Sequence, residues 1–332
     1  MLSPSIPSTV LMILTDMASI FANMLVLLLF AYNPKLKTET SGLALNLCAC
    51  DLVLGFTVLP FGIHNSLSRE RHYSRHGVPC QLMGFLYILL QLGSVQSMTW
   101  ATVDKFTEIC FPLHYAQLFT KRKTCLVLCF LWVYCLGNAC LPFLGMGSYT
   151  YSQNTFLCVP DFEPSSKSYC VVLIAVGVIV PITIMCSLYL YIIYIARKQG
   201  LRGTFECNDQ HCYYVPTKNY FKSSMVLLST AMCLLVCWMP YITISFYKTF
   251  TEHSVPPLAD AISIWLVLFT SAINPWVNTV TQKKYRKALK DSWKKLKQTL
   301  QLPFFGSSAS SSTQGESFCL SEEKKRTTTD LQ

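Results

Sequence analysis

Long apolar stretches alternate with short polar segments along most of this 332-residue chain. Each stretch is long enough to cross about 30 Å of hydrocarbon, which takes roughly 20 helical residues. The seven predicted spans are residues 8–32, 43–67, 79–110, 124–145, 168–196, 222–248 and 256–281. Because the segments between them are too short for a soluble core, the pattern predicts an all-α fold, a seven-transmembrane helix bundle.

A different periodicity follows the last span. Apolar side chains recur there at helical spacing among lysines, at Tyr285, Leu289, Trp293, Leu296 and Leu300. This pattern is typical of an amphipathic helix in the membrane surface, and it predicts a short eighth helix over residues 282–302. A soluble surface helix is the alternative, although no soluble core could receive its apolar stripe. Residues 1–7 then form an extracellular N-terminus, residues 8–281 the bundle, and the Ser/Thr-rich residues 303–332 a disordered cytoplasmic tail.

Composition and charge agree with a membrane protein and set its orientation. Hydrophobic residues make up 52% of the chain and charged residues only 13%, against about 25% charged in soluble proteins. With the N-terminus outside, the inner segments carry 18 Lys and Arg and the outer segments five. The positive-inside rule therefore predicts an outer N-terminus and a cytoplasmic C-terminus. The basic inner surface favours membrane lipids or a partner protein over nucleic acid.

Sixteen cysteines are present, and most lie inside the apolar spans, where we expect small packing residues. Cys80 opens the third span and Cys158 follows the fourth, so both are predicted to face an oxidising compartment. A disulfide between them is expected, with two free thiols as the alternative. The segment Glu206–Cys212 in the third inner loop holds three possible zinc ligands without a partner pair. A solvated loop is favoured there over a metal site.

Each span carries a polar residue, a tryptophan or a proline at membrane depth. The most demanding is Asp51 in the second span, because a carboxylate there costs roughly 2.5–3.5 kcal/mol on insertion scales. The others include Asn23, Ser94, Asp104-Lys105-Phe106, Trp132, Pro181 with Tyr189, Cys237-Trp238-Met239-Pro240, and Ser271-Ala272-Ile273-Asn274-Pro275-Trp276-Val277-Asn278. In this order they resemble the rhodopsin-like (class A) G-protein-coupled receptor family, as a divergent, orphan-like member. The resemblance covers nearly all of residues 8–300.

The resemblance implies an activation switch and a G-protein-coupling face. The residues it assigns to them are Asp104, Lys105, Phe106, Pro181, Tyr189, Trp238, Pro240, Asn274, Pro275 and Asn278. A proline inside a helix removes a backbone hydrogen bond and kinks it, so the last three spans can act as hinges. A static kink that only aids packing is the alternative.

Two positions depart from the family pattern. Lys105 stands where an arginine is usual and Asn278 where a tyrosine is usual. Lysine keeps the charge but lacks the planar fork of five donors, so weak coupling is expected. The inner start of the sixth span, from Lys218 to Met225, contains no acid, and Asp104 is the expected neighbour of Lys105.

A hydrated polar core is also implied by the resemblance. Its residues would be Asn23, Asp51, Ser94, Ser271 and Asn274. Oxygen ligands suit a hard cation, so an allosteric sodium ion at Asp51 is expected, and no other cofactor. A hydrogen-bonded polar core without an ion is the alternative.

The outer pocket implied by the resemblance is aromatic or apolar, with one amide. Its residues are Tyr87, Gln91, Trp238, Tyr241, Trp265 and Leu268. Tyr87 occupies the place where receptors for biogenic amines carry an aspartate, and Asp16 lies at the periphery. Such a pocket suits an uncharged or lipid-like ligand, and it could equally be filled by the receptor's own side chains.

The leading hypothesis is a plasma-membrane receptor that signals to a heterotrimeric G protein. No nucleophile–base pair or phosphate loop occurs in the sequence, so an enzyme is not expected. Receptor kinases and arrestin are expected partners of the serines and threonines around 307–313. A seven-helix scaffold that does not couple is the main alternative. A transporter is less favoured because the deep polar groups converge on Asp51 and no internal repeat is visible.

Overall fold

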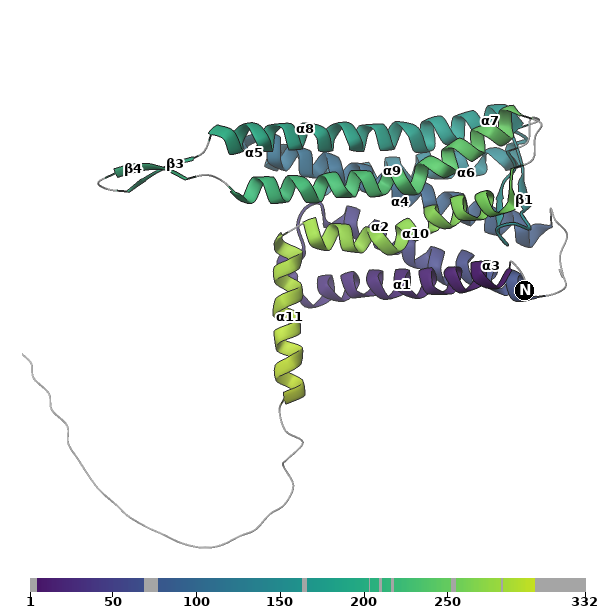
Figure 1. The fold of residues 1–332 in the computed structure, drawn as a ribbon, viewed down its shortest axis with the longest axis horizontal. Helices are drawn as coiled ribbons and strands as arrows, with labels where there is room; N and C mark the ends of the chain where they lie inside the picture. Colours follow the sequence, from purple (N-terminus) through teal and green to yellow (C-terminus); the bar gives the residue numbers. More distant parts are fainter. Residues whose placement is uncertain are drawn as a thin grey trace, which may run out of the picture. The chain divides into compact units, whose positions relative to one another are not determined.

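The computed structural model describes residues 5–68, 77–162, 166–202, 204–208, 211–215, 218–251, 255–281 and 283–301. Within these residues seven helical spans are long and apolar enough to cross a membrane, as the sequence predicts. They are formed by α1 (Ser5–Tyr32), α2 (Ser41–Phe56) with α3 (Val58–Leu67), α4 (Val78–Cys110), α6 (Lys121–Cys140), α7 (Lys167–Val171) with α8 (Val180–Arg202), α9 (Lys218–Phe250) and α10 (Pro257–Thr281). The seven-helix bundle is therefore confirmed, and Figure 1 shows its helices side by side.

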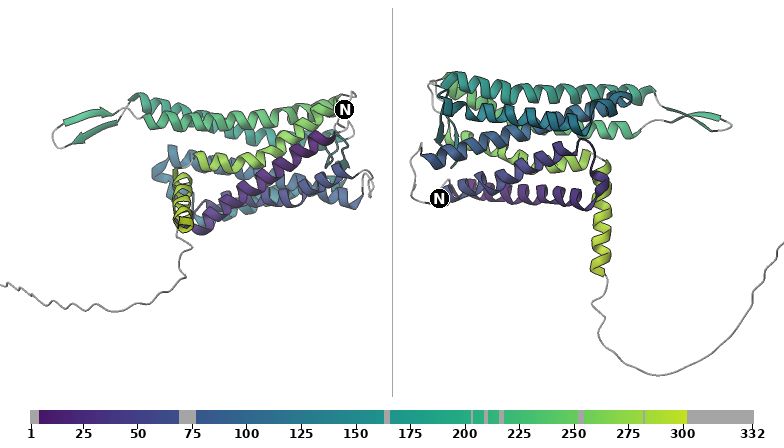
Figure 2. Two further views of the ribbon diagram at one scale, coloured as in Figure 1. Left: turned by 60° about the horizontal axis from the view of Figure 1, so that its bottom comes forward. Right: turned by 180° about the vertical axis from the view of Figure 1, so that it is seen from behind.

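The long helices close into a ring. By contact, α1 is followed by α10, α9, α8, α4 and α2, which returns to α1, while α6 packs on α4 and α2. Figure 2 shows the same helices from two further sides. Helix α4 also contacts both strands of an outer loop, and every residue from Tyr87 to Val95 is buried. In a bilayer each helix satisfies its own backbone groups, so this order is fixed by side-chain packing and by a few polar contacts.

The second span is interrupted between α2 and α3. Thr57 leaves the helical conformation with φ −123° and ψ −68°, and its hydroxyl donates to the Val53 carbonyl at 2.6 Å. Pro60 follows within one turn and has no N–H to continue the helical ladder. The proline accounts for the break, which the apolar pattern alone does not predict.

The fifth span contains a wide π-helical turn over Val172–Ile179. There the Val180 N–H donates to the carbonyl of Ala175, five residues earlier, and Pro181 follows directly. Helices α9 and α10 continue through Pro240 and Pro275. All three predicted prolines thus lie inside helical spans, and their role as hinges stays a prediction.

Several short elements within the loops are not predicted by the sequence. They are η1 (Pro34–Leu36), α5 (Pro112–Leu118), η2 (Leu141–Leu144), strands β1 (Tyr149–Tyr151) and β2 (Cys158–Pro160), and strands β3 (Thr204–Asn208) and β4 (His211–Val215). Each strand pair is an antiparallel hairpin. The segment Glu206–Cys212, expected as a solvated loop, supplies half of the strand residues of the second hairpin, in whose register Cys207 pairs with Cys212.

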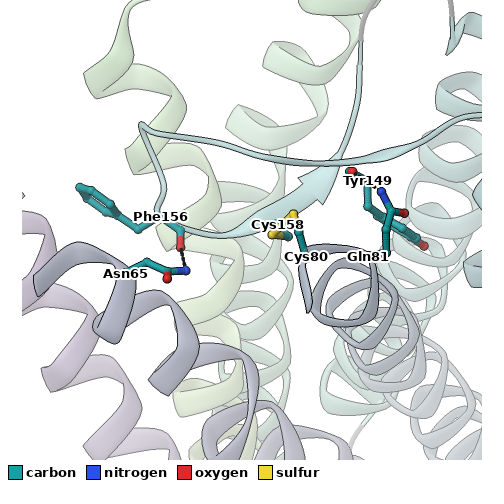
Figure 3. The surroundings of a disulfide bond; sticks show 6 residues. All are labelled: Asn65, Cys80, Gln81, Tyr149, Phe156 and Cys158. Carbon is teal, nitrogen blue, oxygen red and sulfur yellow. Dashed lines mark hydrogen bonds between the residues drawn. A yellow bond between two sulfur atoms is a disulfide. The ribbon is translucent and has the colours of Figure 1, made fainter. Parts of the chain in front are cut away.

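The first hairpin is tied to the end of the bundle that is predicted to face outside. The disulfide between Cys80 and Cys158 is present, so this prediction is confirmed (Figure 3). Beside it, the Gln81 side chain donates to the Tyr149 carbonyl at 2.8 Å. Gly84 makes room for the loop, because an added Cβ would lie 2.7 Å from the Tyr149 ring.

The predicted eighth helix is α11 (Lys283–Gln301). Its first turns pack against α1: the Tyr285 ring is buried and meets Phe30 edge-to-face at 5.5 Å. The Asn33 side chain donates to the Ser292 hydroxyl at 3.2 Å. These contacts fix where the helix begins, and its place in the membrane surface stays a prediction.

We expect Cys80→Ser to lower the thermal stability of the purified protein, because a native disulfide typically contributes about 2–5 kcal/mol. The unfolding transition should be measured in detergent, without reductant, beside Cys125→Ser, which removes an exposed free cysteine. Thiol labelling of both Cys80 and Cys158 in the folded, unreduced protein would contradict the bond.

Candidate functional site

A carboxylate without any solvent exposure lies where three helices meet. Asp51 on α2 is 0% exposed. The Ser94 hydroxyl on α4 donates to its Oδ1 at 2.6 Å, and the Asn274 amide on α10 donates to its Oδ2 at 3.0 Å. Both carboxylate oxygens therefore have a partner on another helix, which is the condition for keeping such a group inside an apolar core.

Helix α1 joins this centre through a buried asparagine. The Asn23 amide donates to the carbonyls of Ser19 and Ser271, at 2.9 and 3.1 Å. Its own Oδ1 and the Ser271 hydroxyl are buried and have no hydrogen-bond partner among the described residues. The structure thus brings together all five residues predicted for the polar core, and two of their oxygens have unused capacity.

The donor set fits a hard cation. It offers one carboxylate, the Ser94 hydroxyl and two unpartnered neutral oxygens, on Asn23 and Ser271, and oxygen ligands of this kind are those that such ions prefer. The same atoms could be satisfied by water in a polar core without an ion.

The predicted ligand pocket separates into two parts. Its inner part lies among Tyr87 and Gln91 on α4 and Trp238 and Tyr241 on α9, all of them buried. Only about 20 Å³ remains between these side chains, which is about enough for one water molecule. The Gln91 amide faces this void, and neither its oxygen nor its nitrogen has a partner in the described part of the chain. Here the protein's own aromatic side chains fill the centre.

Trp265 and Leu268 belong to a different space. They line an open cavity of about 800 Å³ between α1, α10 and the loop at 153–157. The Trp265 ring nitrogen donates to the Thr15 hydroxyl at 2.9 Å, which ties α10 to α1 beside the cavity. The six predicted pocket residues therefore do not surround one site.

At the inner end of α4, Asp104 and Lys105 have separate partners. The Asp104 carboxylate accepts hydrogen bonds from the Tyr115 hydroxyl at 2.7 Å and from the Thr40 hydroxyl at 3.2 Å. Burial and the nearby Asp104 raise the pKa of Tyr115, so its hydroxyl keeps the proton it donates. The Lys105 ammonium lies 3.9 Å from the Glu108 carboxylate, an i,i+3 neighbour that the sequence reasoning overlooked.

The other predicted switch residues are spread along the bundle. The Tyr189 hydroxyl on α8 lies 3.0 Å from Thr102 Oγ1 on α4, and Phe106 packs edge-to-face on Phe111 and Tyr191. Asn278 belongs to α10, but its side chain lies outside the described part of the structure.

One outer cluster was missed by the sequence reasoning. The Lys248 ammonium, at the end of α9, lies 2.7 Å from the Asp260 carboxylate at the start of α10, and the Asn154 amide from the outer loop donates to the same carboxylate at 3.1 Å. Asp260 is only 3% exposed. One signal in the sequence could have indicated this cluster. It is the lysine in the last turn of one predicted helix, followed shortly by an acid in the first turn of the next.

Known proteins resemble this chain along most of its length. A family model described as 7 transmembrane receptor (rhodopsin family) matches residues 22–277. A melanopsin-like protein of Danio rerio is 25% identical over 282 residues, which cover 83% of this chain and 56% of that protein. The chain thus spans little more than half the length of that relative.

Two further relatives are closer to this chain in length. The histamine H2 receptor of Cavia porcellus is 26% identical over 84% of this chain and 77% of its own length. The melatonin receptor type 1C of Gallus gallus is 26% identical over 84% of this chain and 79% of its own length.

We expect sodium chloride to raise the melting temperature of the purified protein above its value in choline chloride at equal ionic strength. An ion held by Asp51 stabilises only the folded state, by about 1.4 kcal/mol at ten times its dissociation constant. Asp51→Asn should abolish the difference, whereas Asp16→Asn, which changes another buried acid, should keep it. If the wild type has the same melting temperature in both salts, the result supports the alternative, a hydrogen-bonded polar core without an ion.

Proposed function

Because the chain belongs to the rhodopsin family of seven-transmembrane receptors, we propose that it is a cell-surface receptor that passes an outer signal to heterotrimeric G proteins. Members of this family are receptors and not enzymes, so the chain is not an enzyme. The observation that carries the proposal is the hydrogen-bonded centre of Asp51, Ser94 and Asn274, which joins α10 to α2 and α4 one residue before Pro275.

The mechanism we infer is a rearrangement of α9 and α10 about their prolines. Pro240 has no N–H to donate to the carbonyl four residues earlier, so α9 is weakest beside Trp238. Trp238 meets Tyr241 edge-to-face at 6.1 Å and borders the void of about 20 Å³. A signal that repacks these rings would change the angle of α9, and the change would reach the inner face at Lys105.

In this proposal, bound sodium opposes the rearrangement of the helices. When bound at Asp51, with Ser94, Ser271 and Asn274 near it, the ion would supply positive charge to a buried carboxylate and so favour the packing of α2, α4 and α10 found here. Asn23 would orient the Ser271 backbone through its amide.

Orientation and partners complete the proposal. The excess of Lys and Arg in the segments 33–41, 112–123, 197–222 and 282–300 supports a cytoplasmic C-terminus in the plasma membrane. The lysines of α11 suit anionic lipid. Receptor kinases and arrestin are proposed for the serines near 307–313, which lie outside the described residues.

A non-coupling scaffold is the second candidate, and one observation favours it. Lys105 is paired with Glu108 on its own helix, and its single ammonium offers an inserted partner fewer fixed donors than an arginine would. A scaffold would have the same membrane bundle but would not promote nucleotide exchange on G proteins.

The decisive experiment is nucleotide exchange on purified heterotrimeric G proteins at matched receptor amounts. We expect Lys105→Arg, alone or with Asn278→Tyr, to raise exchange, because about 1.4 kcal/mol changes the population of a minor active state roughly tenfold. Lys35→Arg, an exposed lysine on the inner turn η1, is the matched control and should change nothing.

Three outcomes of the exchange measurement separate the readings. Exchange that rises in the variants supports a weakly coupling receptor. Strong exchange by the wild type with no gain in either variant contradicts the weak-coupling expectation but keeps the receptor. No exchange by any form with any G protein supports the scaffold.

We also expect biogenic amines to be inactive. The relatives named above are called after histamine and melatonin, but Tyr87 stands where amine receptors carry an acid, and the centre around it is filled. Histamine at micromolar concentration should leave nucleotide exchange unchanged. A potent amine response that disappears in Asp16→Asn would contradict this expectation and move recognition toward α1.

A further inference from the structure

The largest cavity that we describe lies away from the centre of the bundle. It encloses about 800 Å³ between the outer ends of α1 and α10 and the loop at 153–157. We propose that it binds a neutral lipid amphiphile, a molecule with a long apolar body and one small uncharged head group. The binding is a claim of its own, and only its signalling consequence rests on the receptor function proposed above.

The walls select an apolar body. Met12, Ile264 and Leu268 are buried at the inner side of the cavity and Trp265 lies beside them. None of the described residues that line it has an ionisable side chain. A fatty-acid anion or a cationic amine would therefore lose its hydration without gaining a charged partner from these walls.

Most of the polar side chains gather on one side. Gln153, Asn154 and Thr155 come from the outer loop, and Ser8 lies near the start of α1. The Thr155 hydroxyl is the informative one: the residue is 6% exposed, and its Oγ1 has no hydrogen-bond partner in the part of the chain that the structure describes. A rotation of the Thr155 side chain about χ1 would bring this hydroxyl to the cavity, where the head group of a ligand would supply the missing hydrogen bond.

The loop holds Thr155 in a fixed place. On one side, the Asn154 amide donates to Asp260 at 3.1 Å. On the other, the Phe156 carbonyl accepts from the Asn65 amide at 3.1 Å, as Figure 3 shows. The head-group side is thus preorganised, which lowers the entropy cost of binding.

The cavity borders the face that meets lipid. Leu11 on α1 and Leu258 and Ile262 on α10 line it and are also 43%, 72% and 45% exposed. They lie within predicted membrane spans. A molecule already dissolved in the outer leaflet, with its head toward water and its tail inward, has the same orientation as the polar and apolar sides of the cavity.

Occupancy has a route to the proposed switch. Leu268 lies one helical turn before Ser271 on α10, and the Trp265 ring nitrogen bonds to Thr15 on α1. A ligand that separates α1 from α10 here would therefore act on the helix that carries Asn274.

The test is photo-cross-linking of the full-length receptor in nanodiscs with monooleoylglycerol that bears a diazirine in its chain. Cross-links should map to residues 7–12 and 257–268, and unlabelled monooleoylglycerol should compete with them. Oleate has the same chain and a charged head, and it should compete at least tenfold less well.

Two pairs of variants localise the site. Ala261→Trp fills the cavity and should reduce labelling at least tenfold, whereas Ala18→Trp, on the exposed face of α1, should not. Thr155→Val removes the hydroxyl and should weaken competition about threefold to tenfold, the usual range for one hydrogen bond. Thr183→Val is its control, because that hydroxyl donates to the Ile179 carbonyl four residues earlier in the same span.

The outcomes keep binding and signalling apart. Labelling that Ala261→Trp leaves unchanged, cross-links elsewhere, or equal competition by oleate would overturn the proposal. Saturable labelling with no effect on nucleotide exchange would support binding in the cavity and overturn its link to the proposed switch. Exchange that responds to monooleoylglycerol in Ala261→Trp as in the wild type would place recognition elsewhere and overturn the proposal.

Discussion

The packing of this bundle depends on one carboxylate that has no contact with solvent. Asp51 is tolerated at membrane depth because Ser94 and Asn274 each donate to one of its oxygens. Sliding α4 or α10 by even one residue would leave a charged oxygen unpaired in an apolar medium, which costs several kcal/mol. The relative heights of α2, α4 and α10 are therefore fixed far more tightly than apolar side chains alone could fix them, and permitted motions are tilts about this point.

The spans were predictable because lipid imposes a single rule on each segment, namely that the backbone must satisfy itself. The Cys80–Cys158 bond was predictable from the placement of Cys80 at an outer helix end and of Cys158 in an outer loop. The break at Thr57, the wide turn before Pro181 and the hairpins in the loops were not. The break follows from Pro60, which a hydropathy pattern does not register. The wide turn and the hairpins depend on how particular carbonyls and side chains meet across the fold, and hydropathy contains no information on that.

The candidate site divides in the same way. The polar core around Asp51 was visible because buried polar groups need partners and the sequence offers few of them. Only part of the ligand pocket could be predicted from the sequence. Residue types at Tyr87, Trp238 and Tyr241 indicate an aromatic centre, but whether the rings leave a space or fill it depends on rotamers and on packing at near-crystalline density. Lys248 and Asp260 were not singled out in the sequence, and only the fold brings them together and places Asn154 beside Asp260.

The outer loop is fastened at several points: by the disulfide to α4, by Gln81 at Tyr149, by Asn65 at Phe156 and by Asp260 at Asn154. Phe162 adds a ring that meets Tyr241 at 6.0 Å. Because the outer loop is held to α3, α4 and α10, it cannot move aside without breaking several of these contacts together. A ligand that enters between the exposed apolar residues of α1 and α10 would then arrive through the bilayer, and the rate of a response would depend on how strongly the molecule partitions into the membrane.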